Sequence, residues 1–147
     1  MANLNISQGQ LNRILTSIVI SAHPTLNITS EYMGKSFAAM HPDGPFVQQI
    51  DTGTGIVTSP EPYIMMAINV GLLRSQGLSA AWLTQIETQT VYLGTVTGYS
   101  DSTVFGPVKL RDVSVTHFDP GAWDGLDPIV ALTLRGKLNI NNSLWNI

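Results

Sequence analysis

Apolar and polar residues alternate along several stretches of the chain, which is the pattern of a β-strand with one buried face. In residues 129–140 the apolar face carries Val130, Leu132, Leu134, Leu138 and Ile140. The other face carries Ala131, Thr133, Arg135, Lys137 and Asn139. We therefore predict a long strand with one wet face here. Similar alternation predicts long strands at 11–21, 63–73 and 108–118.

Shorter β-rich runs separated by Gly, Pro, Asp and Ser predict strands at 46–51, 55–59 and 91–97. Residues 78–89 break the pattern, because Leu78, Trp82 and Ile86 are spaced four apart, as on one face of a helix. We expect Trp82 to pack this helix against the sheet. Residues 33–45 and 120–128 are predicted to be loops, and residues 1–147 to form a single β-rich domain with one helix.

Residues 52–55 read TGTG, a glycine pattern that also occurs in phosphate-binding loops. The stretch lacks the third glycine of a dinucleotide fingerprint, since Thr58 stands at that position, and it lacks the lysine and helix of a P-loop. We therefore predict a turn between two strands. Pro60 and Pro62 then favour extended backbone ahead of the strand at 63–73.

The composition limits the classes of partner. Only 12% of residues are charged, against about 25% in ordinary domains, so much of the surface must be uncharged and suited to contact with other protein chains. Seven Lys and Arg against ten Asp and Glu give a net charge of −3, with no basic run. This balance argues against tight binding of DNA or RNA.

The chain contains no cysteine, which excludes disulfides and thiolate chemistry. Its first residues lack the basic and apolar segments of a signal peptide, and no window approaches 18 apolar residues. The sequence thus predicts a soluble chain that is not secreted and has no membrane segment.

Two His-x-Asp pairs are the strongest chemical candidates: His41 with Asp43, and His117 with Asp119. Residues two apart on a strand share a face, so together the pairs offer the ligands of one metal ion. However, Pro42 and Pro120 favour turns in which Asp binds its own backbone. We therefore predict no metal site and no cofactor.

The remaining candidate residues do not support catalysis either. His23 precedes Pro24 in a predicted turn, and no Gly-x-Ser-x-Gly elbow marks a serine nucleophile. Asp124 and Asp127 form a carboxylate pair that glycoside cleavage could use, but Asp-Gly and Asp-Pro are also common turn sequences. We predict that the protein is not an enzyme.

Two blocks of the chain each combine several elements in a distinctive order. The first, residues 52–87, joins a threonine-rich turn, Ser-Pro-Glu-Pro, an alternating strand and a Leu-Leu pair to one helix. The second, residues 109–145, is a pair of strands ending in Gly-x-x-x-Ile-Asn-x-x-Leu-Trp. In these blocks the chain resembles the tail tube proteins of bacteriophages with contractile tails. With the N-terminal strand the resemblance spans nearly the whole chain, and it rests on strand and turn patterns rather than on a chemical motif.

The resemblance implies a small β-barrel or sandwich with one flanking α-helix, six copies of which close into a ring. Rings stack into a hollow tube whose long strands line a water-filled lumen. It implies that residues 33–60 form an extended loop or hairpin that reaches the adjacent ring, with Phe37, Phe46 and Ile56 as apolar anchors. Thr133, Arg135, Lys137 and Asn139 become candidates for the lumen strand.

The same resemblance implies a structural role in the virion tail, assembled in the host cytoplasm. Its expected partners are further copies of the chain and the sheath, tape-measure and baseplate proteins. DNA would pass through the lumen into the host without specific binding, and the low charge of this chain agrees with a wall that does not grip phosphate. Arg135 and Lys137 go against this unless acidic groups pair with them or they point into an interface.

Three alternatives remain open on the sequence. One is the tube protein of a related injection machine, such as a tailocin or a secretion system, which shares fold and ring form. The second is a small metal-dependent enzyme that uses the His-Asp pairs. The third is a β-sandwich binding module that exposes four aromatic residues: Tyr63, Tyr92, Tyr99 and Trp123.

Overall fold

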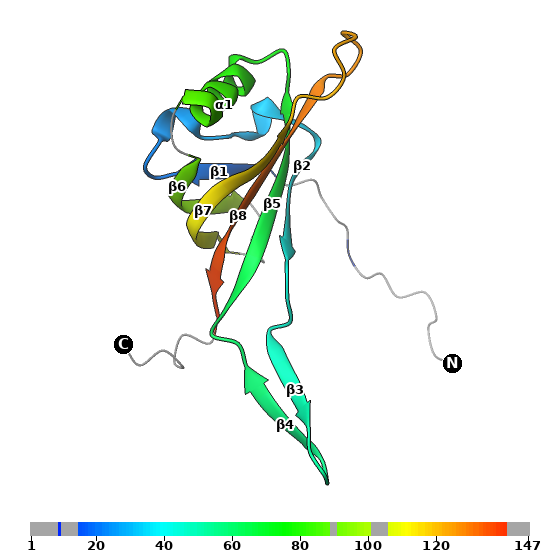
Figure 1. Ribbon diagram of the computed structural model, residues 1–147. Helices are drawn as coiled ribbons and strands as arrows, with labels where there is room; N and C mark the ends of the chain where they lie inside the picture. Colours follow the sequence, from blue (N-terminus) through cyan, green and yellow to red (C-terminus); the bar gives the residue numbers. More distant parts are fainter. Residues whose placement is uncertain (1–8, 10–14, 89–90, 101–105, 141–147) are drawn as a thin grey trace, which may run out of the picture.

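The structure, a computed structural model, describes residues 9, 15–88, 91–100 and 106–140, and leaves the side chains of 35–37 and 88 outside that description. Its elements follow one another along the chain as shown in Figure 1. They are β1 (Thr16–Ile20), the 3-10 turns η1 (Pro24–Leu26) and η2 (Ser30–Tyr32), β2 (Met33–Pro42), β3 (Val47–Asp51), β4 (Ile56–Pro60), β5 (Tyr63–Leu73), α1 (Gly77–Thr88), β6 (Tyr92–Ser100), β7 (Val108–Asp119) and β8 (Ile129–Asn139).

Six strands form one antiparallel sheet in the order β1-β6-β7-β8-β5-β2, while β3 and β4 form a separate hairpin. The sheet curls into a half-barrel, and α1 lies at one end of it (Figure 1). The two end strands approach each other across the opening, since the Thr16 hydroxyl donates to Met33 Sδ at 3.5 Å. The predicted mainly β fold with one flanking helix is confirmed.

Alternation decides which face of the long strands is buried. Along β5 the residues from Ile64 to Leu72 are buried at every second position, and β8 repeats this from Val130 to Leu134. These two strands pair over their whole length, from Tyr63 opposite Asn139 to Leu73 opposite Ile129. Their apolar side chains therefore fall on the same face and fill the inside of the curl, as the sequence predicts.

Trp82 closes one end of this core. Its side chain is fully buried and packs in the same apolar cluster as residues of β1, β5, β6, β7 and β8. The prediction that Trp82 joins the helix to the sheet is confirmed. The helix itself spans Gly77–Thr88, within one residue of the predicted limits.

Gly136 lies where β7 crosses close over β8. A methyl group added at Gly136 would overlap Cγ2 of Val113 and stand 3.1 Å from the carbonyl oxygen of Arg111. At this place the pairing of β7 with β8 shifts register between Arg111 and Ser114, and Asp112 adopts a positive φ of 53°. This irregularity is typical of a β-bulge, which bends a strand and increases its twist.

One predicted loop is wrong. Residues 33–45 were expected to form a loop, but Met33–Pro42 is strand β2 at the edge of the sheet. Small residues such as Ala38 and Ala39 give this segment little hydrophobic alternation, whereas backbone pairing to β5 does not depend on side-chain pattern. The predicted strand at 11–21 is β1, which begins at Thr16; residues 11–14 lie outside the described part.

Candidate assembly surfaces

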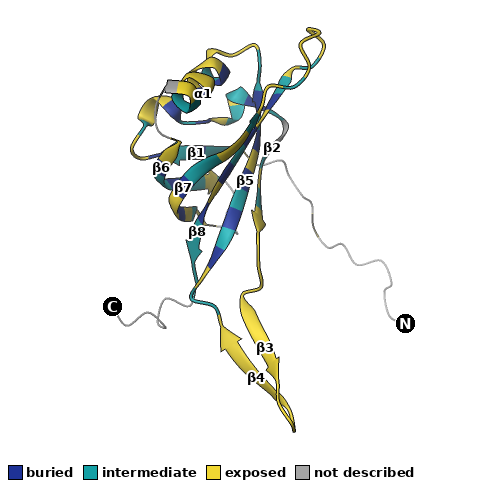
Figure 2. Cartoon of the chain, in the orientation of Figure 1, coloured by how far each residue is buried: buried dark blue, intermediate teal, exposed yellow. Residues whose placement is uncertain are grey.

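A two-stranded hairpin projects from the half-barrel. β3 and β4 pair only with each other, in register from Val47 opposite Pro60 to Asp51 opposite Ile56. Every residue of both strands is exposed, as Figure 2 shows. Because a two-stranded hairpin alone is marginally stable in water, this segment is a strong candidate for contact with another chain.

The TGTG stretch forms the tip of this hairpin. The Thr52 amide donates to the Gly55 carbonyl oxygen at 2.7 Å, the Thr52 hydroxyl donates to the same oxygen at 2.9 Å, and the Gly55 amide donates to Thr52 Oγ1 at 3.1 Å. The threonine side chain thus closes the turn locally. The prediction of a turn between two strands is confirmed.

Large apolar side chains lie exposed along the hairpin and at its base: Phe46, Val47, Ile50, Ile56 and Val57. Phe46 and Ile56 are two of the predicted anchors. The third, Phe37, lies on β2 within the main sheet, and its side chain lies outside the described part. The projecting segment is therefore shorter than the predicted 33–60, because β2 runs inside the sheet and only the chain beyond it extends outward.

The base of the hairpin is tied to the sheet by backbone hydrogen bonds. The Asp43 amide donates to the Met65 carbonyl oxygen at 2.8 Å, and the Glu61 amide donates to that of Phe46 at 2.9 Å. β2 leads into β3, and β4 leads into β5. β2 and β5 are neighbours in the main sheet, just as β3 and β4 are neighbours in the hairpin. The hairpin is thus an extension of the β2–β5 pair.

The four predicted lumen-strand residues lie on one face of β8, opposite the core. Thr133 donates to Asn69 Oδ1 at 3.1 Å, and Arg135 Nε lies 2.9 Å from Asp43 Oδ2. Lys137 Nζ stands 5.3 Å from the centre of the Tyr63 ring, and Asn139 is the register partner of Tyr63. The structure therefore brings these residues together as one polar strip across β5 and β8.

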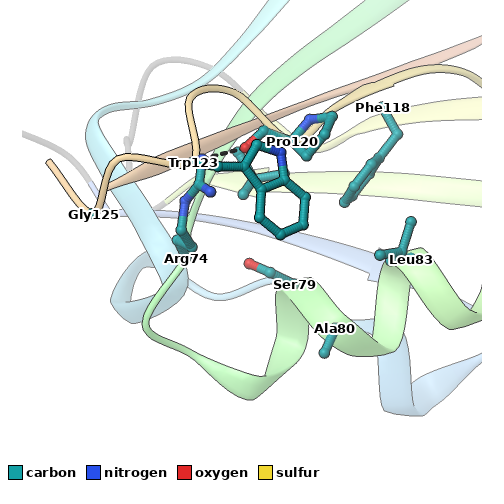
Figure 3. A pocket seen from close by; sticks show the side chains of 9 residues that line it. Arg74, Ser79, Ala80, Leu83, Phe118, Pro120, Trp123 and Gly125 are labelled. Atoms are coloured by element: carbon teal, nitrogen blue, oxygen red, sulfur yellow. Dashed lines mark hydrogen bonds between the residues drawn. The ribbon is translucent and has the colours of Figure 1, made fainter. Parts of the chain in front are cut away.

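The opposite end of the molecule carries a cavity of about 400 Å³ between α1 and the β7–β8 loop, residues 120–128. Figure 3 shows the side chains that surround it. Its lining is mostly apolar, with Leu83, Phe118, Trp123 and Val130. Trp123 is 85% exposed and Leu126, further along the loop, is 84% exposed. An exposed Trp beside an apolar cavity is typical of an interaction surface.

Arg74 joins this loop to the end of β5. Its guanidinium donates to the Pro120 carbonyl oxygen, and its amide donates to that of Pro128 at 2.8 Å. Its Nε is buried without a hydrogen-bond acceptor among the described residues. Arg74 is also the one charged residue of the cavity lining in the described part of the chain.

The loop is ordered by three aspartates acting on their own backbone. Asp119 Oδ1 accepts from the Gly121 amide and Asp124 Oδ1 from the Leu126 amide, both at 2.9 Å, while Asp127 Oδ1 accepts from the Ile129 amide at 3.1 Å. Hydrogen bonds from the amides of Ile129 and then Ala122 hold the pKa of Asp127 below its ordinary value, and the nearby Arg74 charge adds to this. The predicted turn roles of Asp124 and Asp127 are confirmed.

The two His-Asp pairs are not brought together. β5 and β8 lie between β2, which carries His41, and β7, which carries His117. Three strand spacings of about 4.8 Å separate those strands, so both pairs cannot bind one ion in the sheet. Asp43 faces Arg135 instead. In the described residues, no group of three His, Asp or Glu side chains is placed to hold a metal.

The four exposed aromatic residues do not form one binding surface. Tyr63 pairs with the last residue of β8, whereas Trp123 precedes the first residue of that strand, so the two lie at opposite ends of the sheet. Tyr92 donates to Asp112 Oδ1 at 2.8 Å, beside the bulge in β7. The geometry gives no support to a single aromatic ligand site.

Sequence reasoning found the hairpin but missed the cavity, whose lining comes from five separate places in the chain. Trp123 was its one sequence signal.

None of the described helices is long and apolar enough to cross a membrane. A scan against protein-family models and a search of curated proteins both find no match to this chain.

Proposed function

We propose that this protein is the structural subunit of a phage tail tube, in which hexameric rings stack into a hollow tube that conducts the genome into the host. The observation that carries the proposal is the β3–β4 hairpin, whose strands are exposed on both faces yet carry large apolar side chains. A monomer leaves these apolar side chains of the hairpin exposed to water, whereas a repeating assembly covers them in every copy.

The edge of the sheet supports ring formation. Among the strands that the structure describes, β2 pairs with β5 on one side only, so its outer edge offers backbone groups for a strand of a neighbouring copy. Repeating such a head-to-tail contact closes a ring when the rotation between copies divides a full turn. Six copies is the number implied by the resemblance of residues 52–87 and 109–145 to tail tube proteins.

The polar strip on β5 and β8 supports the role of a lumen wall. Its two cations are engaged within the chain, because Arg135 pairs with Asp43 and Lys137 lies over the Tyr63 ring. Pairing reduces the attraction of these groups for phosphate. A wall of this kind lets DNA slide past without holding it, in agreement with the net charge of −3.

By this proposal the protein acts in the virion tail after assembly in the host cytoplasm, with the sheath, tape-measure and baseplate proteins as partners. Its mechanism is mechanical, and it requires neither cofactor nor catalysis. The alternative is the tube protein of a related injection machine, such as a tailocin or secretion system, which shares the fold and ring form. Finding the gene beside those for head and DNA-packaging proteins would favour the phage tail.

The test is negative-stain electron microscopy of the concentrated protein, with light-scattering mass measured on the same sample. Rings with six-fold symmetry or hollow tubes, and a mass near six times 15.9 kDa or above, are the expected results. A homogeneous monomer that persists at high concentration, also with purified baseplate present as a nucleus, would contradict the proposal.

A further inference from the structure

Charged side chains are divided unevenly between the two ends of the β7–β8 pair. The loop that joins these strands projects past the sheet at the end where α1 lies (Figure 1). Residues 119–128 contain no basic residue and three acidic residues: Asp119, Asp124 and Asp127. The start of β7 and the end of β8, at the other end of the pair, carry three cations: Lys109, Arg111 and Lys137. One end of the pair is thus acidic and the other basic.

Lys109, Arg111 and Lys137 form one cationic surface on the outside of the sheet. Arg111 is the register partner of Lys137, and residues paired across an antiparallel ladder lie on the same face. Lys109 is two residues from Arg111 along β7 and shares that face. Both β7 cations are exposed. Because like charges directly opposite each other repel, the cationic surface favours an acidic group that comes from outside the pair.

The acidic residues nearest to the cationic surface are engaged elsewhere. Asp43 pairs with Arg135, and Glu61 lines the same depression as Asp43 at the base of the hairpin. Asp112 accepts from the Tyr92 hydroxyl at 2.8 Å. β6, the other neighbour of β7, carries no charged residue. In the part of the chain that the structure describes, the cations of β7 therefore form no ion pair.

We propose that the β7–β8 loop of one copy docks on the cationic surface of a second copy. This inference rests on the proposed tube assembly, in which the loop contact joins successive rings and is separate from the hairpin. Trp123 and Asp124 are the docking side chains of the loop. Arg111 is the cation that receives them, with Lys109 and Lys137 on either side.

The loop cannot reach the cationic surface of its own chain. Arg111 and Asp119 are eight residues apart on β7, and a strand rises about 3.3 Å per residue, so roughly 25 Å separates them. Copies arranged head to tail along the β7–β8 direction bring the acidic end of one onto the basic end of the next. Two loops or two cationic surfaces that meet each other would instead place like charges together, which disfavours the reversed arrangement.

The loop presents side chains that recognise a guanidinium group. Asp124 is exposed, and its Oδ1 accepts from the Leu126 amide at 2.9 Å. A carboxylate has further lone pairs, so it can accept from an arginine at the same time. Trp123 is 85% exposed, and the face of its ring attracts a cation. Trp and Arg are enriched among the residues that dominate the affinity of protein interfaces.

Arg74 reduces the negative charge of the loop without removing it. Its guanidinium donates to the Pro120 carbonyl oxygen, and its charge acts on Asp127. Three acidic residues less this one cation leave a charge of −2 at the loop end. The attraction between exposed charges extends only about 8 Å at physiological salt. It therefore sets the orientation of copies that are already close.

Docking also neutralises cations that lie beside the polar strip of β5 and β8. In the proposed tube, Lys109 and Arg111 extend the face of that strip onto β7. Unpaired cations there would attract the phosphates of passing DNA. An acidic loop from the next ring occupies them instead, which agrees with a wall that does not hold DNA.

Carbodiimide cross-linking tests the contact directly, because this reagent joins a carboxylate to a lysine amine only where the two touch. Tubes assembled from equal parts of isotope-labelled and unlabelled protein, on purified baseplate where a nucleus is needed, are cross-linked, digested and mapped by mass spectrometry. We expect a link from the peptide of Asp124 to that of Lys109 or Lys137, including links that join labelled to unlabelled protein.

Charge reversal measures the contribution of the contact. Arg111→Asp or Asp124→Arg alone places like charges together, and we expect the concentration needed for tube formation to rise by about tenfold or more. The double variant exchanges the two charges and should return this concentration to within about threefold of the wild-type value. Glu87→Arg, a charge reversal at an exposed position of α1 outside both surfaces, is the matched control.

The outcomes separate this contact from the proposed function. Tubes that show no link from Asp124 to Lys109 or Lys137, or that form normally with Arg111→Asp, would overturn the contact and leave the tube role standing. Single variants that fail and are not restored in the double variant would also overturn it, because the loss would then come from folding. A wild-type protein that remains monomeric with baseplate present would overturn both. The expected link together with restoration supports the contact.

Discussion

Arg135 Nε lies 2.9 Å from Asp43 Oδ2 in the same chain. This ion pair links the middle of β8 to the point where the chain leaves β2 for the hairpin. It also supplies the acidic partner that the sequence analysis requires for a basic residue on the strand proposed to line a lumen. The partner comes from within the subunit, across β5, through a turn that sequence spacing alone does not bring near β8.

We expect this ion pair to contribute little to stability, because the two side chains are 46% and 38% exposed. A double-mutant cycle with Arg135→Ala and Asp43→Ala should give a coupling of roughly 0.2–1 kcal/mol, falling as salt is added. Urea unfolding of the four proteins at low and high salt measures it. A coupling well above 1 kcal/mol that salt does not change would show that the pair is shielded from solvent.

Replacing Trp82 should have a large effect on folding. Trp82→Ala removes the largest fully buried side chain of the described core, and such truncations cost about 3–5 kcal/mol. Urea unfolding followed by circular dichroism gives the change in the free energy of unfolding. Leu83→Ala, one residue along the same helix and partly exposed, is the control and should cost much less. Equal losses for both would mean that Trp82 does not close the core.

Gly136 should tolerate no side chain. Gly136→Ala places a methyl group against Val113 and the Arg111 carbonyl, and overpacking of this kind costs about 1–3 kcal/mol. The midpoint of thermal or urea unfolding measures the loss. Gly53→Ala at the hairpin tip is the matched control, because open space surrounds it and its φ is not positive. Similar midpoints for the two variants would show that β7 can move away from β8.

Asp127 should contribute to stability only above acidic pH. Its folded pKa lies below the ordinary value of 3.8, owing first to the Ile129 amide and then to the Ala122 amide. A depressed folded pKa stabilises the native state above the unfolded pKa, and this contribution is lost as pH falls through the folded pKa. Wild type and Asp127→Asn should therefore differ most near neutral pH and converge at strongly acidic pH.

Urea unfolding from pH 7 to pH 2 tests this convergence. Asp124→Asn, in the same loop, is the control variant. A difference between wild type and Asp127→Asn that stays constant over the whole range would show that the Asp127 charge is not involved.

The sequence predicts most where a pattern is local. β5 and β8 follow from apolar alternation, α1 from the spacing of Leu78, Trp82 and Ile86, and the hairpin from TGTG between two β-rich runs. β2 was missed because its strand state depends on backbone pairing with β5 rather than on its small side chains. Local sequence patterns could not predict which distant segments of the chain contact one another.

The cavity illustrates that limit. Arg74, Leu83, Phe118 and Trp123 are ordinary residues in their local sequence and become a surface only when β5, α1 and β7 converge at one end of the sheet. The polar strip is an intermediate case. Its β8 residues were predicted from alternation, whereas their partners Asn69, Asp43 and Tyr63 came from the strand order.

The direct continuation of the hairpin into β2 and β5 determines how the subunit carries a mechanical load. A pull on the tip enters the sheet at the first residue of β5, which is paired with β8 over all eleven of its residues. Interstrand hydrogen bonds lie perpendicular to antiparallel strands, so the part of this force that acts along β5 shears them together instead of opening them one at a time. The hairpin is thereby anchored so that tension spreads over the full length of the β5–β8 pairing.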